Sequence, residues 1–513
     1  MVSFVKLRAF VSLWLPRSVS DTMVLVKKLA ILIFVFALSY TAFSETKTYI
    51  GHSPDECARI RFVCPEGEEY FSDAKRCGCE KKLAANPSSS GQPIDSLIEK
   101  EYSSLDALYK HLHTNPELSY HEVNTSVRIA EELRKAGFEV TEKFGEYPDP
   151  KLTGYGIVAV MKNGKGPTVL VRTDLDALPL EEKTGLPYAS KVKTKNDAGE
   201  DVSVMHACGH DIHMTVFVGT ARLLSALRDQ WHGTLIMVGQ PAEEIAPGGA
   251  EAMLRAGLYT KFPKPDYCLA LHDDASLATG KAGWVEGYAL ANVDTVDITI
   301  RGAGGHGAYP HTTKDPVVVA LQTIVSREVQ PGQFAVVTVG SFHGGTKHNI
   351  IPDDAKLQLT VRTYTKEIRQ QVLSAIERIT KGITQAAGVP AGREPIIDLH
   401  PAKFVPATYN NPDLVKKTVS AFQEALGKDN VVERIPVGGG EDFSRFSLDD
   451  LSVPSFQFWL GAVDPKKIAE SEKTKTPLPS LHSPLFAPVP ERTIRTGIKA
   501  MSTAVINLMK PTS

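Results

Sequence analysis

The chain has 513 residues, 42% of them apolar and 23% charged, which is enough for two or three domains with substantial cores. Its formal net charge of −2 and the lack of a basic run argue against nucleic acid as a partner. We therefore expect the partners to be small molecules or other proteins.

Residues 1–44 have the pattern of a targeting segment. Met23 is a second candidate start, followed by Lys27 and Lys28, an apolar run over 29–38 and small residues ending at Ser44. This order is typical of a secretory signal, and the apolar run is short for a membrane span. We expect cleavage near Ser44, export from the cytoplasm and no stable membrane span afterwards; a retained anchor is the alternative.

Residues 45–83 form a cysteine-rich segment, and a polar linker follows over 84–93. The segment places four cysteines close together: Cys57, Cys64, Cys77 and Cys79. In an exported chain this spacing predicts two disulfides, with three connectivities open, and a small zinc knot is the alternative.

The rest of the chain alternates helical and strand patterns, which predicts an α/β fold with a mixed sheet covered by helices. We expect a catalytic domain in two parts, 94–288 and 403–513, separated by an α+β satellite domain over 289–402. Apolar spacing predicts helices at 94–113, 214–227, 248–256, 315–327, 366–387 and 491–508. Predicted strands are 156–161, 168–172, 234–239, 267–271, 293–301, 357–363 and 456–460, and 194–203 is expected to be a loop.

The octapeptide at 206–213 gathers a thiol, a carboxylate and three imidazoles just before a predicted helix. Such a cluster without a second CxxC or HxxxH is not a zinc finger, so a catalytic metal is the sharper hypothesis. Within it, Cys208 and His210 are the candidate ligands, and His206 and His213 are candidates for a supporting role.

Two acidic groups directly follow apolar strands, where α/β sheets bind ligands. The first contains Asp174 and Asp176, and the second is the pair Glu243 and Glu244. Adjacent carboxylates repel unless a cation or a proton lies between them, so one can bind metal while its neighbour acts as a base. Turn aspartates and an acidic helix start are the structural alternatives.

Two histidines, His272 after a strand and His482 near the C-terminus, complete a set of nitrogen, oxygen and sulfur donors. The set suits a pair of divalent ions that generate hydroxide and polarise a carbonyl. Its members are Cys208, His210, Glu244, His272 and His482.

Within the satellite segment, His306 lies in a glycine-framed string and Asn349 precedes two isoleucines. Both side chains carry groups that can donate to a developing oxyanion. Turn chemistry and surface histidines are the alternative explanation.

Over residues 100–510 these motifs, in this order, resemble the amidohydrolase branch of the M20 metallopeptidase family. That branch contains hippurate hydrolase, N-acyl-amino-acid amidohydrolases and auxin-conjugate hydrolases. The matching strings include Arg172-Thr-Asp-Leu-Asp-Ala-Leu-Pro, Met205-His-Ala-Cys-Gly-His-Asp, Gln240-Pro-Ala-Glu-Glu, Asn349-Ile-Ile-Pro, Glu441-Asp-Phe and His482-Ser-Pro-Leu-Phe.

The resemblance implies two divalent ions, usually zinc, manganese or cobalt, held by the five donors, with the Cys208 thiolate close to both. It implies Glu243 as the general base and Asp174 as a supporting group beside the ligands. His306 and Asn349 would contact substrate, in the family often across a homodimer interface formed by the satellite domain.

The implied reaction is hydrolysis of the amide bond of N-acyl amino acids. A metallo-dipeptidase and an inactive extracellular binding protein are the alternatives. One departure from the family pattern, Asp273-Asp274 after His272, predicts a more acidic rim at this site.

Overall fold

The computed structural model describes residues 47–51, 53, 68–72, 77–81, 94–303, 305–306 and 321–510. These residues belong to two compact units, 1–90 and 91–513, which we describe separately. The predicted signal segment lies outside the described residues, so export remains a prediction. None of the described helices has the length and apolar character needed to cross a bilayer.

The first unit contains a three-stranded antiparallel sheet in the order β1-β3-β2. Its strands are β1 (Lys47–Gly51), β2 (Glu68–Ser72) and β3 (Cys77–Lys81). Cys77 is fully buried and disulfide-bonded. The pairing of the four cysteines stays a prediction, because most of this segment lies outside the described residues.

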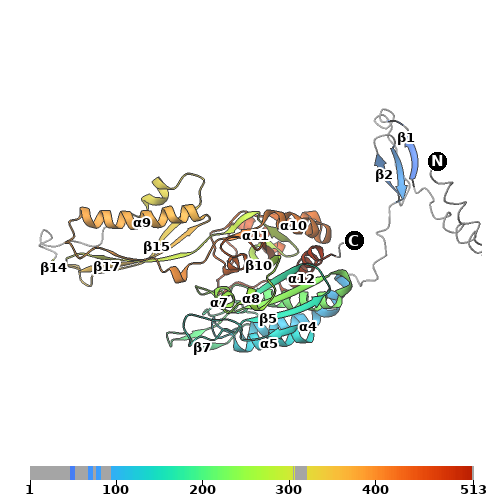
Figure 1. The fold of residues 1–513 in the computed structure, drawn as a ribbon, viewed down its shortest axis with the longest axis horizontal. Coiled ribbons are helices and arrows are strands. Elements are labelled where there is room, and N and C mark those ends of the chain that lie inside the picture. The colour runs from blue at the N-terminus through green and yellow to red at the C-terminus, as the bar shows by residue number, and fades with distance from the viewer. Residues whose placement is uncertain are drawn as a thin grey trace, which may run out of the picture. The chain divides into compact units, whose positions relative to one another are not determined.

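The second unit is built on a mixed eight-stranded sheet in the order β20-β11-β21-β10-β6-β9-β5-β4. Its strands β5 and β10 are labelled in Figure 1. The strands are β4 (Glu139–Thr141), β5 (Ile157–Asn163), β6 (Thr168–Asp174), β9 (Gly233–Gln240), β10 (Tyr267–Ala278), β11 (Ala282–Trp284), β20 (Val431–Glu433) and β21 (Ser455–Val463). The central strands β9, β6, β10 and β21 run parallel. This sheet between helices confirms the predicted α/β fold class.

Helices cover both faces of this sheet because its central strands are buried over most of their length and carry apolar side chains on both faces. One face packs against α4 (Ile94–Thr114), α5 (Val123–Lys135), α6 (His210–Ala226), α10 (Pro412–Leu426) and α12 (Pro490–Leu508). The other packs against α7 (Gly249–Arg255), α8 (Leu258–Lys261) and η6 (Asp442–Ser447). Successive residues of β6 alternate between the two cores: Val169 and Val171 join the first, and Leu170 joins the second.

A second, antiparallel sheet has the order β15-β17-β13-β18. Its strands are β13 (Asp294–Arg301), β15 (Ala335–Gly344), β17 (Asp354–Thr363) and β18 (Ile396–Asp398), and α9 (Lys366–Ala386) lies along one face (Figure 1). Buried and half-buried residues alternate along β13, as the sequence pattern predicts. The helix predicted at 315–327 falls largely outside the described residues, whose part contains the short π-helix Ile324–Glu328.

Several element boundaries differ from the predictions. The expected loop at 194–203 is a hairpin of β7 (Lys193–Lys195) and β8 (Asp201–Ser203), closed by a turn that the Asn196 side chain stabilises. Strand β10 continues past His272 to Ala278, because Asp273 and Asp274 still pair with β21. Strands β5 and β6, for which no pairing was predicted, follow each other in the sequence but are separated in the sheet by β9.

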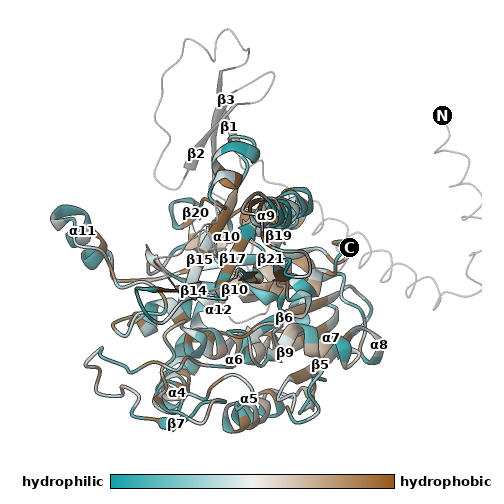
Figure 2. Cartoon of the chain, turned by 90° about the vertical axis from the view of Figure 1, so that its left-hand side faces the viewer, coloured by the Kyte–Doolittle hydropathy of each residue, from teal (hydrophilic) through white to brown (hydrophobic). Residues whose placement is uncertain are grey.

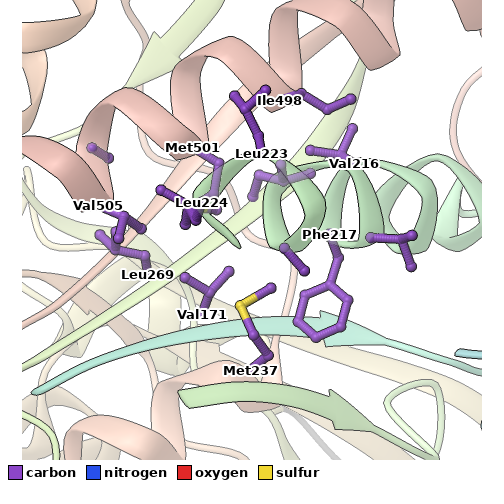
Figure 3. Packing of buried hydrophobic residues seen from close by; sticks show 14 of the residues in the cluster. Val171, Val216, Phe217, Leu223, Leu224, Met237, Leu269, Ile498, Met501 and Val505 are labelled. Atoms are coloured by element: carbon purple, nitrogen blue, oxygen red, sulfur yellow. The ribbon is translucent and has the colours of Figure 1, made fainter. Parts of the chain in front are cut away.

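Helix α6 is the centre of the larger core and packs between α12 and the sheet (Figure 3). Hydropathy along the helices fits this layering: α11 (Pro465–Thr474), which buries no residue, is hydrophilic over most of its length (Figure 2). The α6–α12 contact depends on a glycine. A methyl group on Gly497 would lie 2.7 Å from Val216 Cγ2 and 2.8 Å from Leu460 Cδ2.

We therefore expect Gly497→Ala to lower the Tm, because the branched Val216 side chain has little freedom to move and overpacking costs about 1–3 kcal/mol. Gly382→Ala is the matched control, since Gly382 is an exposed position of α9 with open space around it. There the better helix propensity of alanine predicts a small rise in Tm. Thermal unfolding of both variants checks the contrast, and an unchanged or raised Tm for Gly497→Ala would contradict it.

Candidate metal centre

The octapeptide His206–His213 forms the turn before α6 and the first turn of that helix. The helix begins at His210, four residues earlier than the sequence pattern predicts, with Gly209 as N-cap at φ 77°. A Cβ atom on Gly209 would lie 2.1 Å from Asp273 Oδ2. Glycine is therefore required both for the left-handed backbone and for the close approach of β10.

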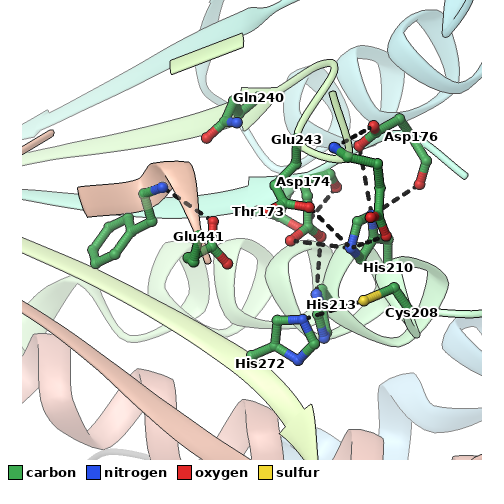
Figure 4. A network of polar contacts seen from close by, with 12 residues as sticks. Thr173, Asp174, Asp176, Cys208, His210, His213, Gln240, Glu243, His272 and Glu441 are labelled. Atoms are coloured by element: carbon green, nitrogen blue, oxygen red, sulfur yellow. Dashed lines mark hydrogen bonds and ion pairs between the residues drawn. The ribbon is translucent and has the colours of Figure 1, made fainter. Parts of the chain in front are cut away.

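The five predicted ligands lie together at this helix start, although they come from four separate segments. Figure 4 shows three of them, Cys208, His210 and His272. Cys208 Sγ is 3.5 Å from His272 Nε2 and 3.2 Å from His482 Nε2. Glu244 Oε1 is 3.3 Å from His482 Nε2 and 3.8 Å from His210 Nε2. Two three-donor groups share the thiol: Cys208 with His210 and His272, and Cys208 with Glu244 and His482.

These donors fit a pair of divalent cations. His210 Nε2 and Glu244 Oε1 are buried and have no hydrogen-bond partner among the described residues. The other ring nitrogen of His210, Nδ1, lies 2.8 Å from the carbonyl oxygen of Asp176, which orients the ring. A cysteine, three histidines and a glutamate are a donor set suited to zinc and related transition metals.

Cation binding would have to displace protons here. Burial and the nearby carboxylate of Glu244 raise the pKa of the Cys208 thiol well above its usual range. Burial lowers the pKa of His210, but Asp174, Asp176 and Cys208 outweigh burial and raise it well above normal. Metal affinity should therefore fall as the pH is lowered.

Glu243 lies in a strongly acidic environment. Burial and the carboxylates of Glu441, Glu244 and Asp442 raise its pKa well above the usual range. Its Oε2 is 4.0 Å from His210 Nε2, so it borders the predicted ligands. A carboxyl group with a raised pKa is suited to accept and return a proton near neutral pH.

Arg172 is fully buried and its positive charge partly balances these carboxylates. No role was predicted for it from the sequence. It donates to Asp174 at 2.8 Å, to Glu441 at 2.9 Å and to Gln240 at 2.8 Å. It thus joins the ends of β6 and β9 to the start of η6. The one feature of the sequence that could have indicated this role is an arginine within the otherwise mostly apolar strand β6.

Asp174, the predicted supporting group, also contacts the helix start, with its Oδ1 2.9 Å from His213 Nδ1. His213 Nε2 lies 3.3 Å from Asp273 Oδ1. Burial lowers the pKa of His213, but Asp174 and Asp273 outweigh it and raise the pKa to about 9. The ring nitrogens of His206 have no hydrogen-bond partner within the described part, and burial lowers its pKa to about 4.

The predicted acidic rim after His272 does not form. Asp273 is fully buried against His213, and Asp274 pairs with Arg434 at 2.9 Å. Both carboxylates are therefore neutralised by residues distant in the sequence.

A cavity of about 430 Å³ opens onto the donors. Arg362 of β17 is the only arginine or lysine among the described residues that line it, and its Nη1 donates to the carbonyl of Gly438 at 2.9 Å. Asn349 is not among the described lining residues, and its Oδ1 is a buried atom with no described partner. His306 pairs through its backbone with Ile350, and its side chain lies outside the described residues.

Comparison with known proteins places the chain in a family. The model of peptidase family M20/M25/M40 matches residues 170–483. Thermostable carboxypeptidase 2 of Saccharolobus solfataricus is 36% identical over 363 residues, which cover 69% of this chain and 85% of the relative. N-acetylcysteine deacetylase of Bacillus subtilis is 36% identical over 358 residues, covering 68% and 86%.

Among solved structures, a dinuclear metal-binding peptidase of family M20 from Bacillus subtilis has a TM-score of 0.62 and 29% identity. The match covers 80% of this chain and 99% of that one. The resemblance inferred from the motifs is thereby confirmed. The chain belongs to peptidase family M20/M25/M40 and is an amidohydrolase of that family.

Proposed function

We propose that the protein hydrolyses the amide bond of N-acyl amino acids with the help of two divalent ions. The observation that carries the proposal is the pair of three-donor groups that share Cys208 at the edge of a cavity lined by Glu243. When bound, the ions would lower the pKa of a water molecule and polarise the acyl carbonyl. Zinc, manganese and cobalt remain the candidate metals.

The residues of the chain supply the rest of the chemistry. Cys208, His210, Glu244, His272 and His482 would hold the cations, and Asp174 fixes the ring of His213. Glu243 accepts a proton from the attacking water and passes it to the leaving amine nitrogen. Arg362 provides a positive charge for the carboxylate of the amino acid.

A dipeptidase activity is the second candidate, because one similar relative is named a carboxypeptidase. The two substrate classes differ on the acyl side of the scissile amide bond. In a dipeptide this acyl group carries a free ammonium, and in a simple N-acyl amino acid it does not. An inactive binding protein does not fit, since the chain is an amidohydrolase of a hydrolase family.

We expect the protein to cleave N-acetyl-L-alanine with a kcat/KM at least about tenfold above that for L-alanyl-L-alanine. The physical reason is the cost of placing an ammonium group beside cations bound in a site of reduced dielectric. Detection of released alanine by amine labelling and chromatography measures both reactions. Cleavage of the dipeptide alone would reject the acyl-amino-acid proposal.

Glu243→Gln should lower kcat by about 10²–10⁴-fold while leaving the metal content of the purified protein near that of the wild type, because the change removes the proton acceptor and no proposed ligand. Glu244→Gln is the matched variant one residue away and should lose metal, because it weakens a proposed ligand. Activity assays with elemental analysis by mass spectrometry separate the two effects. Full activity of Glu243→Gln, or of wild type stripped by a chelator, would contradict the mechanism.

We further propose that two copies pair through the satellite domain. Strand β15 is an edge of its sheet, and its Val336 and Phe342 are exposed apolar side chains. Such an edge is prone to pairing with another chain. Asn349 does not line the cavity of its own chain among the described residues, so a partner copy would give it a site on which to act. We expect the same role for His306.

Mixing two inactive variants tests this arrangement. Asn349→Ala and Glu243→Gln should each be inactive alone, and a reassociated equimolar mixture should recover about a quarter of wild-type activity, because half of the subunits pair as heterodimers with one intact site of two. Light scattering coupled to size-exclusion chromatography provides the mass. A monomer, or a mixture with no recovery, would reject a shared site.

A further inference from the structure

A second cavity adjoins the one that opens onto the candidate metal donors. Its volume is about 580 Å³. Three residues, Val437, Trp459 and Leu481, line both cavities. His482, a proposed ligand, directly follows Leu481, so the two cavities share part of their wall beside the donors.

The wall of this second cavity is mainly apolar. Ile435 and Leu478 line it in addition to the three shared residues. Ile435 is 81% exposed and Val437 is 40% exposed, so two large apolar side chains face solvent at one place. Apolar side chains exposed around a concave site are typical of ligand-binding surfaces.

The charged groups that line this cavity already have partners of opposite charge. Arg434 contacts Asp274 at 2.9 Å and donates to Ser276 Oγ at 2.8 Å. Asp273 is fully buried and turned toward His213. No unpaired charge among the described lining residues calls for a charged ligand, so an uncharged group fits best.

We propose that this second cavity binds the acyl group of the substrate and favours alkyl or aryl acyl groups larger than acetyl. The inference rests on the proposed hydrolysis of N-acyl amino acids. Arg362, whose positive charge is available to the carboxylate of the amino acid, belongs to β17. This strand is part of the antiparallel sheet β15-β17-β13-β18, called the satellite sheet below. All the described residues that line the second cavity lie in the predicted catalytic domain, within 273–276 and 434–481.

This separation orients the substrate. The carboxylate and the acyl group lie on opposite sides of the scissile amide bond. With the carboxylate at Arg362, the acyl group extends away from the satellite sheet, along the wall formed by Trp459 and Leu481. Each methylene buried there should increase kcat/KM by about fourfold.

The experiment compares N-octanoyl-L-alanine with N-acetyl-L-alanine in the full-length, metal-loaded protein. We expect the wild type to have a kcat/KM at least about tenfold higher for the octanoyl substrate. Ile435→Glu and Leu478→Glu place a carboxylate in the apolar wall and should each lower this octanoyl-to-acetyl ratio by about tenfold. Ile396→Glu is the matched control, since Ile396 is 53% exposed on β18 of the satellite sheet and should leave the ratio unchanged.

The outcomes separate this inference from the proposed function. If the wild type hydrolyses both substrates and the two cavity variants keep the wild-type ratio, the acyl site is rejected and the proposed function stands. If the variants change the ratio between N-acetyl-L-leucine and N-acetyl-L-alanine instead, the cavity holds the amino-acid side chain and the inference is overturned. Hydrolysis of neither N-acyl substrate by the wild type would reject the proposed function itself.

Discussion

The concentration of buried carboxylates around one arginine is the constraint on which the rest of the site depends. Glu243, Glu441 and Asp442 lie near Arg172 at the edge of the cavity, and burial together with Glu441 raises the pKa of Asp442 to about 7, against the lowering effect of Arg172. One guanidinium cannot neutralise this many carboxylates in a medium of low dielectric. Divalent cations at the neighbouring donors would supply the missing positive charge. The same excess of negative charge that makes the metal-free site unfavourable therefore favours metal binding.

The scaffold holds these charges in place by close packing at the start of α6. Gly209 permits Asp273 to approach the helix, and this brings His272 of β10 beside Cys208. From the opposite side, His113 of α4 lies 2.6 Å from Asp211 and 3.1 Å from Glu182. Burial lowers the pKa of His113, but these two carboxylates outweigh it and raise the pKa to about 10. The helix start is thus tied to the sheet and to α4 by charged pairs that water does not screen.

Much of the fold could be predicted because the apolar pattern is strong. The long helices α4, α9 and α12 and the buried strand β21 were expected from their spacing, since each presents a continuous apolar face or run to a core. The predicted ends of elements were wrong where polar residues belong to a helix or a strand. His210 and Asp211 begin α6, and Asp273 and Asp274 continue β10, because contacts to distant residues compensate for polar side chains at those positions.

The sequence by itself determined the chemistry: a thiol, imidazoles and carboxylates in motifs specific enough to indicate an M20 amidohydrolase, with named candidate ligands. Only the tertiary structure decided how their charges are balanced. Asp274 meets Arg434 and Arg172 meets Glu441 across 160 and 269 residues of sequence, so no local pattern could reveal that these carboxylates are paired. The structure likewise assembled Ile435, Trp459 and Leu481 into one apolar wall, because a cavity exists only where separate segments of the chain meet.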